Sequence, residues 1–139
     1  MENFEQSHLV LISLSDTSSS IHGNAKNRLD WLSFPPMVRP YEGGKLPIKR
    51  AEKKCQQLEN LALAVVELAN RRSHSKNLTI VDFCSGGGHL AIILAYLMPE
   101  CVVYLVENKP ESLERAMNRV RTLKLRNCRF FQGKLVFED

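Results

Sequence analysis

The stretch VDFCSGGGH, residues 81–89, decides the fold of this chain. An apolar, β-branched run over residues 78–83 leads into three consecutive glycines, and apolar residues at helical spacing follow up to Met98. Glycines suit such a turn because the backbone must turn tightly and approach a ligand closely, with no Cβ in the way. The amide groups at the start of the following helix are then free to meet polar ligand atoms. We therefore predict a strand, a ligand-binding turn and a helix.

The segments around this turn alternate between helix and strand patterns. Unalternating apolar runs at residues 102–106 and 128–131 are typical of strands buried on both faces of a parallel sheet. Apolar residues at helical spacing predict a long helix over residues 49–72, before the first strand, and another over residues 110–123. The predicted fold class is α/β, with about three parallel strands in a doubly wound unit. The apolar stripe of the long helix comprises Leu58, Leu61, Ala62, Val65, Leu68 and Ala69.

The first third of the chain divides into two further segments. Residues 1–28 form a serine-rich lead-in that we expect to be flexible, although Leu9–Leu14 could form a short strand. Residues 29–48 contain paired prolines and glycines, which predict an extended connector whose aromatic side chains dock on the domain. The remaining residues, 49–139, carry the pattern of helices and strands.

Composition narrows the class of protein. A chain of 139 residues is long enough for one domain with a core. No apolar run reaches the roughly 18 residues of a membrane helix, and the N-terminus has no signal-peptide pattern, so we expect a protein of the cytosol or nucleus without membrane contacts. The cysteines have no metal-ligand spacing, so we expect free thiols and no metal site. These cysteines are Cys55, Cys84, Cys101 and Cys128.

The net charge of +4 is unevenly distributed, because basic residues gather in the last third of the chain. A solvated helix surface explains this pattern most simply. The alternative is a surface that attracts RNA or another anionic partner, although no aromatic residues interleave the basic ones. The basic residues are Lys109, Arg115, Arg119, Arg121, Lys124, Arg126, Arg129 and Lys134.

Two acidic residues indicate what the glycine turn binds. Glu107 ends the second strand, 19 positions after Gly88, where a carboxylate can accept hydrogen bonds from both hydroxyls of a ribose. The glycine pattern also satisfies the dinucleotide fingerprint G-x-G-x-x-A. However, Asp82 lies just before the turn, where it would repel a pyrophosphate and attract the cationic amine and sulfonium of S-adenosylmethionine. The charges therefore favour the methyl donor over NAD.

The same residues carry a resemblance to a known family. Residues 82–88, DFCSGGG, resemble motif I of class I S-adenosylmethionine-dependent methyltransferases, with Cys84 where a glycine is usual. Residues 54–61, 80–89 and 106–109 are similar to the methyltransferase-like portion of the glutathione S-transferase C-terminal domain-containing protein family. The resemblance covers roughly residues 29–132 and implies a Rossmann-like methyltransferase fold, of which residues 49–139 would be the N-terminal half.

This resemblance also implies roles for individual residues. Asp82 would lie near the methionyl amine, Gly86 and Gly88 under the methionyl and ribose portion, and Glu107 on the ribose hydroxyls. Asn108 would flank the adenosine, and Gln132 is the candidate for the adenine amine. The complete set of expected cofactor-binding residues is Asp82, Cys84, Ser85, Gly86, Gly87, Gly88, Glu107, Asn108 and Gln132.

Other residues near the turn have simpler interpretations. We expect His89 to pack or hydrogen-bond within the turn and Cys84 to fill space in it, since Cys84 has no identifiable catalytic partner. Gln56, Gln57 and Asn60 either line the cofactor site or only decorate a helix, and the role of Lys54 is open.

The resemblance further implies substrate-side residues beyond the third strand, and the sequence ends at Asp139. We therefore assign no catalytic residue and expect the chain alone to be inactive. The methyl acceptor (RNA, protein or small molecule) is unassigned, and a non-catalytic scaffold module is the alternative function. We also expect an uncovered sheet edge beside residues 80–83, prone to self-association unless Leu9–Leu14 covers it.

Overall fold

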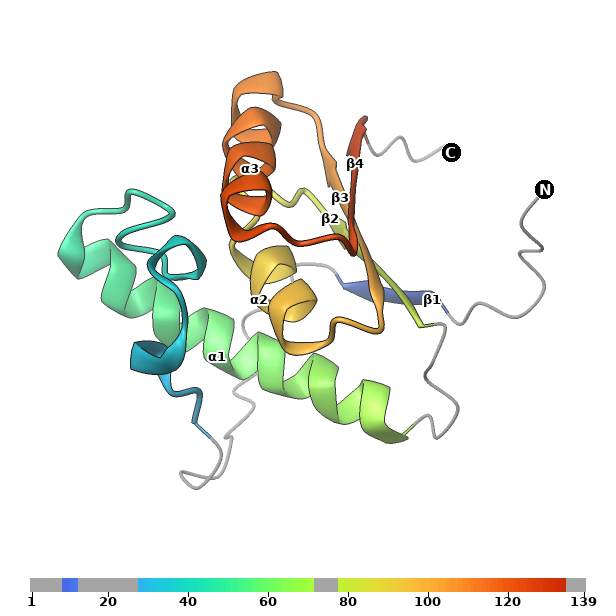
Figure 1. Ribbon diagram of the computed structural model, residues 1–139, viewed down its shortest axis with the longest axis horizontal. Helices are drawn as coiled ribbons and strands as arrows, with labels where there is room; N and C mark the ends of the chain where they lie inside the picture. The colour runs from blue at the N-terminus through green and yellow to red at the C-terminus, as the bar shows by residue number, and fades with distance from the viewer. Residues whose placement is uncertain (1–8, 13–27, 72–77, 135–139) are drawn as a thin grey trace, which may run out of the picture.

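The structure, a computed structural model, describes residues 9–12, 28–71 and 78–134 (Figure 1). Four parallel strands form one sheet in the order β1-β2-β3-β4. Figure 1 shows α2 and α3 on one side of the sheet, and α1 packs against α2. The fold is therefore α/β, as the alternating pattern predicts. The strands are β1 (Leu9–Ile12), β2 (Thr79–Phe83), β3 (Val102–Glu107) and β4 (Cys128–Gln132), and the helices are α1 (Ile48–Arg71), α2 (His89–Leu97) and α3 (Pro110–Leu123).

The core lies between the helices and one face of the sheet. In β2 and β3, buried residues alternate with half-buried ones, so that Ile80, Val103 and Leu105 face the helices with no exposed surface. The prediction that these strands are buried on both faces is wrong for the described part of the chain. The helices α1, α2 and α3 all lie on one side of the strands. On the other face of the sheet, Val81 and Tyr104 are half-buried.

The apolar stripe of α1 is confirmed with one exception. Leu58, Ala62, Val65 and Ala69 are buried, whereas Leu68 is 47% exposed. At 100° per residue, Leu68 lies about 80° around the helix from Leu58, at the margin of the stripe. The burial of Leu68 was therefore predicted wrongly, because the packed surface of this helix is narrower than its apolar surface.

The edge of β2 that the sequence predicts to be uncovered is paired. The short strand β1 runs parallel to β2, with Leu9 opposite Thr79 and Ile12 opposite Asp82. Within the described residues, the prediction of an uncovered edge beside residues 80–83 is therefore wrong. The expected strand is confirmed over Leu9–Ile12 only, and the rest of the lead-in lies outside the described residues.

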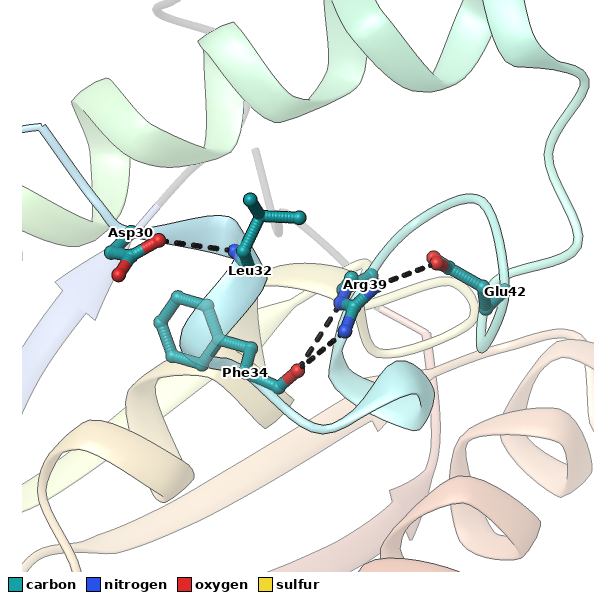
Figure 2. Close-up of polar contacts among 5 residues, drawn as sticks. All are labelled: Asp30, Leu32, Phe34, Arg39 and Glu42. Atoms are coloured by element: carbon teal, nitrogen blue, oxygen red, sulfur yellow. Dashed lines mark hydrogen bonds and ion pairs between the residues drawn. The ribbon is translucent and has the colours of Figure 1, made fainter.

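The connector is folded rather than extended. Two short 3-10 helices, η3 (Trp31–Ser33) and η4 (Pro36–Val38), replace the extended segment that the prolines predict. Figure 2 shows the contacts of Arg39, which follows η4. Its guanidinium donates to the carbonyl of Phe34 at 3.0 and 3.1 Å and pairs with Glu42 at 2.8 Å. In the same view, Asp30 accepts a hydrogen bond from the amide of Leu32.

Docking of the connector aromatics is confirmed for Trp31 and Phe34, whereas Tyr41 is 50% exposed. The ring of Phe34 is 4% exposed and lies 5.5 Å from the ring of Tyr96 on α2 and 5.6 Å from that of Trp31. The edge-to-face contact between Phe34 and Tyr96 adds to the stabilisation that burial of the rings provides. The connector is therefore part of the domain surface that covers α2.

Two further expectations concern the cysteines and the membrane. All four cysteines are free thiols, and Cys101 and Cys128 are buried. Within residues 9–12, 28–71 and 78–134, no helix is both long and apolar enough to cross a bilayer.

Candidate functional site

The turn between β2 and α2 has an unusual backbone. Cys84, Gly86 and Gly88 all adopt positive φ angles of 58°, 56° and 80°. The amide of Ser85 donates to the carbonyl of Val106 on β3 at 3.1 Å, which fixes the turn against the neighbouring strand. For a residue with a Cβ, as Cys84 has, the left-handed region is strained, and such strain occurs often at ligand sites.

The three glycines of the turn have different surroundings. A Cβ added at Gly86 would meet no atom within 4 Å, so Gly86 presents bare backbone to open space. A Cβ added at Gly88 would lie 2.9 Å from the Cβ of Ala116 on α3, and close to Leu105 on β3. Gly88 therefore allows the turn to pack against α3 and β3, and it is not among the residues that line the cavity described next.

A cavity of about 100 Å³ lies over the turn. Five of the nine residues that the sequence indicates for cofactor binding line it, together with His89, Leu90 and two residues of α1, Lys54 and Leu58. The five expected residues are Asp82, Cys84, Ser85, Gly86 and Gly87. The remaining four (Gly88, Glu107, Asn108 and Gln132) lie outside this cavity.

Asp82 is a carboxyl group buried without a partner. Its side chain is fully buried, and neither carboxylate oxygen has a hydrogen-bond partner. Burial raises the pKa of Asp82 to about 7, and the charge of Glu107 adds to this effect. The amide of Ala91, which is near but does not meet hydrogen-bond geometry, and the ammonium of Lys54 both lower the pKa. A cation placed beside these free oxygens would offset the cost of burying the charge.

Glu107 reaches the turn from the end of β3. Its Oε2 accepts a hydrogen bond from the amide of Gly86 at 2.7 Å, and its Oε1 accepts one from the amide of Lys109 at 2.9 Å. Burial tends to raise the pKa of Glu107, but the amides of Lys109, Gly86 and Asn108 outweigh burial and lower it. The carboxylate is therefore ionised at neutral pH, and each oxygen keeps a lone pair that can accept a further hydrogen bond.

His89 is fixed by a buried arginine. Arg119 on α3 is 2% exposed and donates to the carbonyl of Gly87 at 3.1 Å, and its Nη1 lies 3.2 Å from Nδ1 of His89. Burial, together with the charges of Arg119, Lys54 and Arg115, lowers the pKa of His89 to about 4. Because a guanidinium can only donate, Nδ1 of the neutral ring is the acceptor and Nε2 carries the proton. His89 therefore packs within the turn as expected and offers one N–H group to its surroundings.

Arg119 also joins this turn to the connector. Its guanidinium donates to the carbonyls of Met37 at 2.9 Å and Val38 at 3.1 Å. Burial lowers the pKa of Arg119 to about 10, so the side chain remains a cation at neutral pH. The other seven basic residues of the last third are exposed, as a solvated surface predicts: Lys109, Arg115, Arg121, Lys124, Arg126, Arg129 and Lys134.

Asn108 and Gln132 are exposed residues at the end of the sheet beyond Glu107. Asn108 directly follows β3, and Gln132 ends β4, where its backbone is in register with Glu107. Both side chains lie at the carboxyl edge of the sheet, as expected, but neither contributes to a cavity together with Asp82.

A second and larger cavity, of about 440 Å³, adjoins the glycine turn. Lys54 and His89 line both cavities. Among the polar residues whose role the sequence leaves open, Lys54 and Gln57 line this cavity, whereas Gln56 and Asn60 are exposed on α1. The basic residues of this cavity lie four or fewer positions apart on α1, so their spacing was the signal that could have found them. The lining residues are Leu46, Arg50, Lys53, Lys54, Gln57 and His89.

A comparison with known families shows what the segment around the glycine turn is similar to. Residues 74–136 match the family model of a methyltransferase domain. This segment contains the glycine turn, both acidic residues and the strands from β2 to β4. Residues 74–136 are thus similar to a methyltransferase domain, and their strands form a Rossmann-like parallel sheet.

The chain is also similar to a segment of several curated proteins. The chain is 48% identical over 107 residues to the glutathione S-transferase C-terminal domain-containing protein of Xenopus laevis, and 45% identical over 109 residues to that of Homo sapiens. These alignments cover 77% and 78% of this chain but 16% of each relative. The homolog from Drosophila melanogaster is 44% identical over 126 residues, which is 91% of this chain and 20% of the relative. The chain is thus homologous to a segment of these proteins and spans a fifth of their length or less.

Proposed function

We propose that the glycine turn binds S-adenosylmethionine, and that the protein transfers the methyl group of this cofactor to an acceptor. The observation that carries the proposal is Asp82, whose two oxygens are buried without a partner at the wall of a cavity beside bare glycine backbone. The hydroxyl of Ser85 in the same turn also has no partner. These groups fit the cationic amine of a methionyl group, which can donate to all of them.

The cavity over the turn suits only one end of such a cofactor. At about 100 Å³ it is smaller than the 300 Å³ or more of typical cofactor sites. We assign the methionyl end to this cavity and the ribose to Glu107, which lies next to the open surface of Gly86. Asn108 and Gln132 would then flank the adenine at the exposed end of the sheet.

The cofactor supplies an electrophilic methyl group on a sulfonium, and the residues of this chain contribute binding and orientation. Asp82 and Ser85 would hold the amine, and Glu107 would hold the sugar. Arg119 fixes the ring of His89 so that its Nε2–H points away from the guanidinium. Methyl transfer depends largely on holding the acceptor in line with the sulfonium. The described residues contain no group that we assign to this step.

Two other functions compete with this proposal. A scaffold module would retain the fold but bind neither nucleotide nor methyl donor. An NAD-dependent oxidoreductase would place a pyrophosphate at the turn, next to Asp82.

Free thiols at all four cysteines fit the reducing cytoplasm, which we propose as the location.

Calorimetric titration with S-adenosylhomocysteine and with NAD separates these functions. We expect S-adenosylhomocysteine to bind, and Glu107→Ala to weaken its affinity about tenfold or more, since two hydrogen bonds to a charged group are lost. Glu114→Ala, on the exposed side of α3, is the matched control and should bind as the native chain does. Binding of NAD alone would favour the oxidoreductase, and binding of neither ligand would favour the scaffold.

A further inference from the structure

The larger cavity beside the glycine turn is lined by cations. Three of its six lining residues are the basic side chains of Arg50, Lys53 and Lys54, and none of the six is acidic. They occupy one face of α1, because positions separated by three, four and seven residues line up along a helix. Gln57 continues this face by one turn, and His89 closes the cavity from the glycine turn.

Arg50, Lys53 and Lys54 form no salt bridge in the described parts of the chain. The salt bridges found there join Arg39 to Glu42 and Glu67 to Arg71. Lys54 donates to the amide oxygen of Gln57 at 3.5 Å, and its charge also acts on the buried carboxyl of Asp82 in the neighbouring cavity, whereas Arg50 and Lys53 do not line that cavity. Glu52 is near in sequence, but its position two residues after Arg50 places it about 200° around the helix, on the opposite side.

The position of Arg50 in the first turn of α1 is electrostatically unfavourable for the helix itself. The amino end of a helix carries a partial positive charge, which favours acidic residues and disfavours cations. The first turn of α1 contains no acidic residue, and Arg50 is the third residue of the helix. Helix stability therefore does not explain the cluster, whereas an anion would interact favourably with both the side chains and the helix end.

Three observations thus point to the same ligand chemistry: unpaired cations on one helix face, a cavity of about 440 Å³, and the positive end of the helix. The N–H that we assign to Nε2 of His89 adds a further donor to this set of cations. Because His89 and Lys54 also line the glycine-turn cavity, an anion held here would be adjacent to the methionyl end of the cofactor.

We propose that this cavity is a subsite for a phosphate group of the methyl acceptor, held by Arg50, Lys53 and Lys54. The identity of the ligand as the methyl acceptor rests on the proposed function, whereas the presence of a phosphate site does not. A phosphate suits the site better than a carboxylate because it carries up to two negative charges against three cations. A cavity of this volume accommodates a group of nucleotide size.

The test is a calorimetric titration of the 139-residue chain with inorganic phosphate at low ionic strength, in parallel with S-adenosylhomocysteine. We expect the double variant Arg50→Gln, Lys53→Gln to weaken phosphate binding about tenfold, since two charge pairs are removed. The variant Lys49→Gln, Arg126→Gln removes one exposed lysine and one exposed arginine that line neither of the two cavities described above, so it should bind phosphate as the native chain does.

Both double variants should bind S-adenosylhomocysteine as the native chain does, because none of their substitutions touches the glycine turn. If the native chain binds phosphate but not S-adenosylhomocysteine, the proposed function is wrong and the phosphate site remains supported. Absence of phosphate binding by the native chain, equal weakening in both variants, or tighter binding of citrate than of phosphate would overturn the subsite.

A second measurement keeps the test decisive if a variant fails to fold. Amide NMR shifts of the native chain during phosphate addition should change at residues 50–57 and His89, and changes confined to other residues would overturn the proposal.

A short single-stranded oligonucleotide then distinguishes the source of the phosphate. Tighter binding than inorganic phosphate that is lost in Arg50→Gln, Lys53→Gln indicates a nucleic acid, and no gain over inorganic phosphate indicates a small phosphorylated acceptor.

Discussion

The buried carboxyl group of Asp82 affects the stability of the chain as well as the chemistry of the glycine turn. Its carboxyl group is fully buried with no hydrogen-bond partner, so the ionised form is disfavoured. A buried carboxyl without a partner has no structural benefit to the fold, because an apolar side chain of similar size would pack in the same place. We therefore expect this residue to limit the stability of the chain at neutral pH and above.

The variant Asp82→Asn tests this expectation through the pH dependence of stability. The folded-state pKa of Asp82 is raised to about 7, so the folded chain holds a proton that the unfolded chain has released between about pH 4 and pH 7. The free energy of unfolding of the native chain is thereby reduced as the pH rises through this window, by on the order of 4 kcal/mol in total. Asp82→Asn has no such loss.

Urea denaturation at a series of pH values measures the difference between the two chains. We expect the advantage of Asp82→Asn to grow up to about pH 7 and then stay constant. Any contribution from His89 is common to both chains and cancels. Glu114→Gln is exposed and should show no such trend. An advantage that is independent of pH would contradict the assigned cause.

At the residue scale, the sequence predicts what is local and misses what depends on packing. The glycine turn, Asp82 and Glu107 follow from a strand, a turn and the end of the next strand, all within a short segment. The packing of Gly88 was not predicted, because the atom that limits the space there belongs to Ala116 on another helix. Which residues meet across a fold is a tertiary property that a local pattern does not contain.

The elements of the fold are connected by Arg119. From α3, this side chain donates to two carbonyls of the connector and one of the glycine turn, 82, 81 and 32 positions away in sequence. Buried carbonyls that lose their donors cost free energy, because no water replaces the lost hydrogen bonds. Arg119 therefore fixes both η4 and the turn relative to α3.

We expect Arg119→Met to lower the free energy of unfolding by about 3 kcal/mol, since three carbonyls lose a charged donor. Arg121→Met on the exposed side of the same helix is the control and should change stability by about 0.5 kcal/mol or less. Urea denaturation measures both. NMR titration of His89 adds a specific readout: its pKa should rise in Arg119→Met, and an unchanged pKa would contradict the contact.

At the scale of elements, the bounds of the long helices were predicted well, whereas the short helices of the connector were not predicted. The three long helices begin and end within about two residues of the expected bounds, because periodicity and a proline at the start of α3 are strong local signals. The 3-10 turns of the connector were not predicted. Prolines and glycines exclude long helices and strands, but they do not exclude single turns held by side chains such as Arg39.

The whole sheet depends on a strand that is distant in sequence. β1 and β2 are separated by the connector and α1, whereas every other neighbouring pair of strands is separated by one helix only. A run of four apolar residues within a serine-rich segment does not specify its pairing partner. The sequence alone therefore did not determine whether this strand forms beside β2. Pairing with β2 covers the backbone donors and acceptors at one edge of the sheet.

We expect Leu11→Pro to uncover this edge, because proline has no amide hydrogen and disrupts pairing opposite Val81. The free energy of unfolding should fall by at least about 1 kcal/mol, and dimers or larger species should appear in sedimentation velocity as concentration rises. Leu11→Val keeps the amide and should remain like the native chain. A proline variant that sediments as the native chain does at all concentrations would show that β1 does not protect the edge.

The order of strands along the sheet also bears on how the chain folds. Strands β2, β3 and β4 are neighbours in both sequence and space, so each pairing closes a short loop and loses little chain entropy. Joining Ile12 to Asp82 closes a much longer loop for only four paired residues. We therefore expect the glycine turn, which lies between β2 and β3, to take shape during the early local steps, and β1 to be the last strand to join.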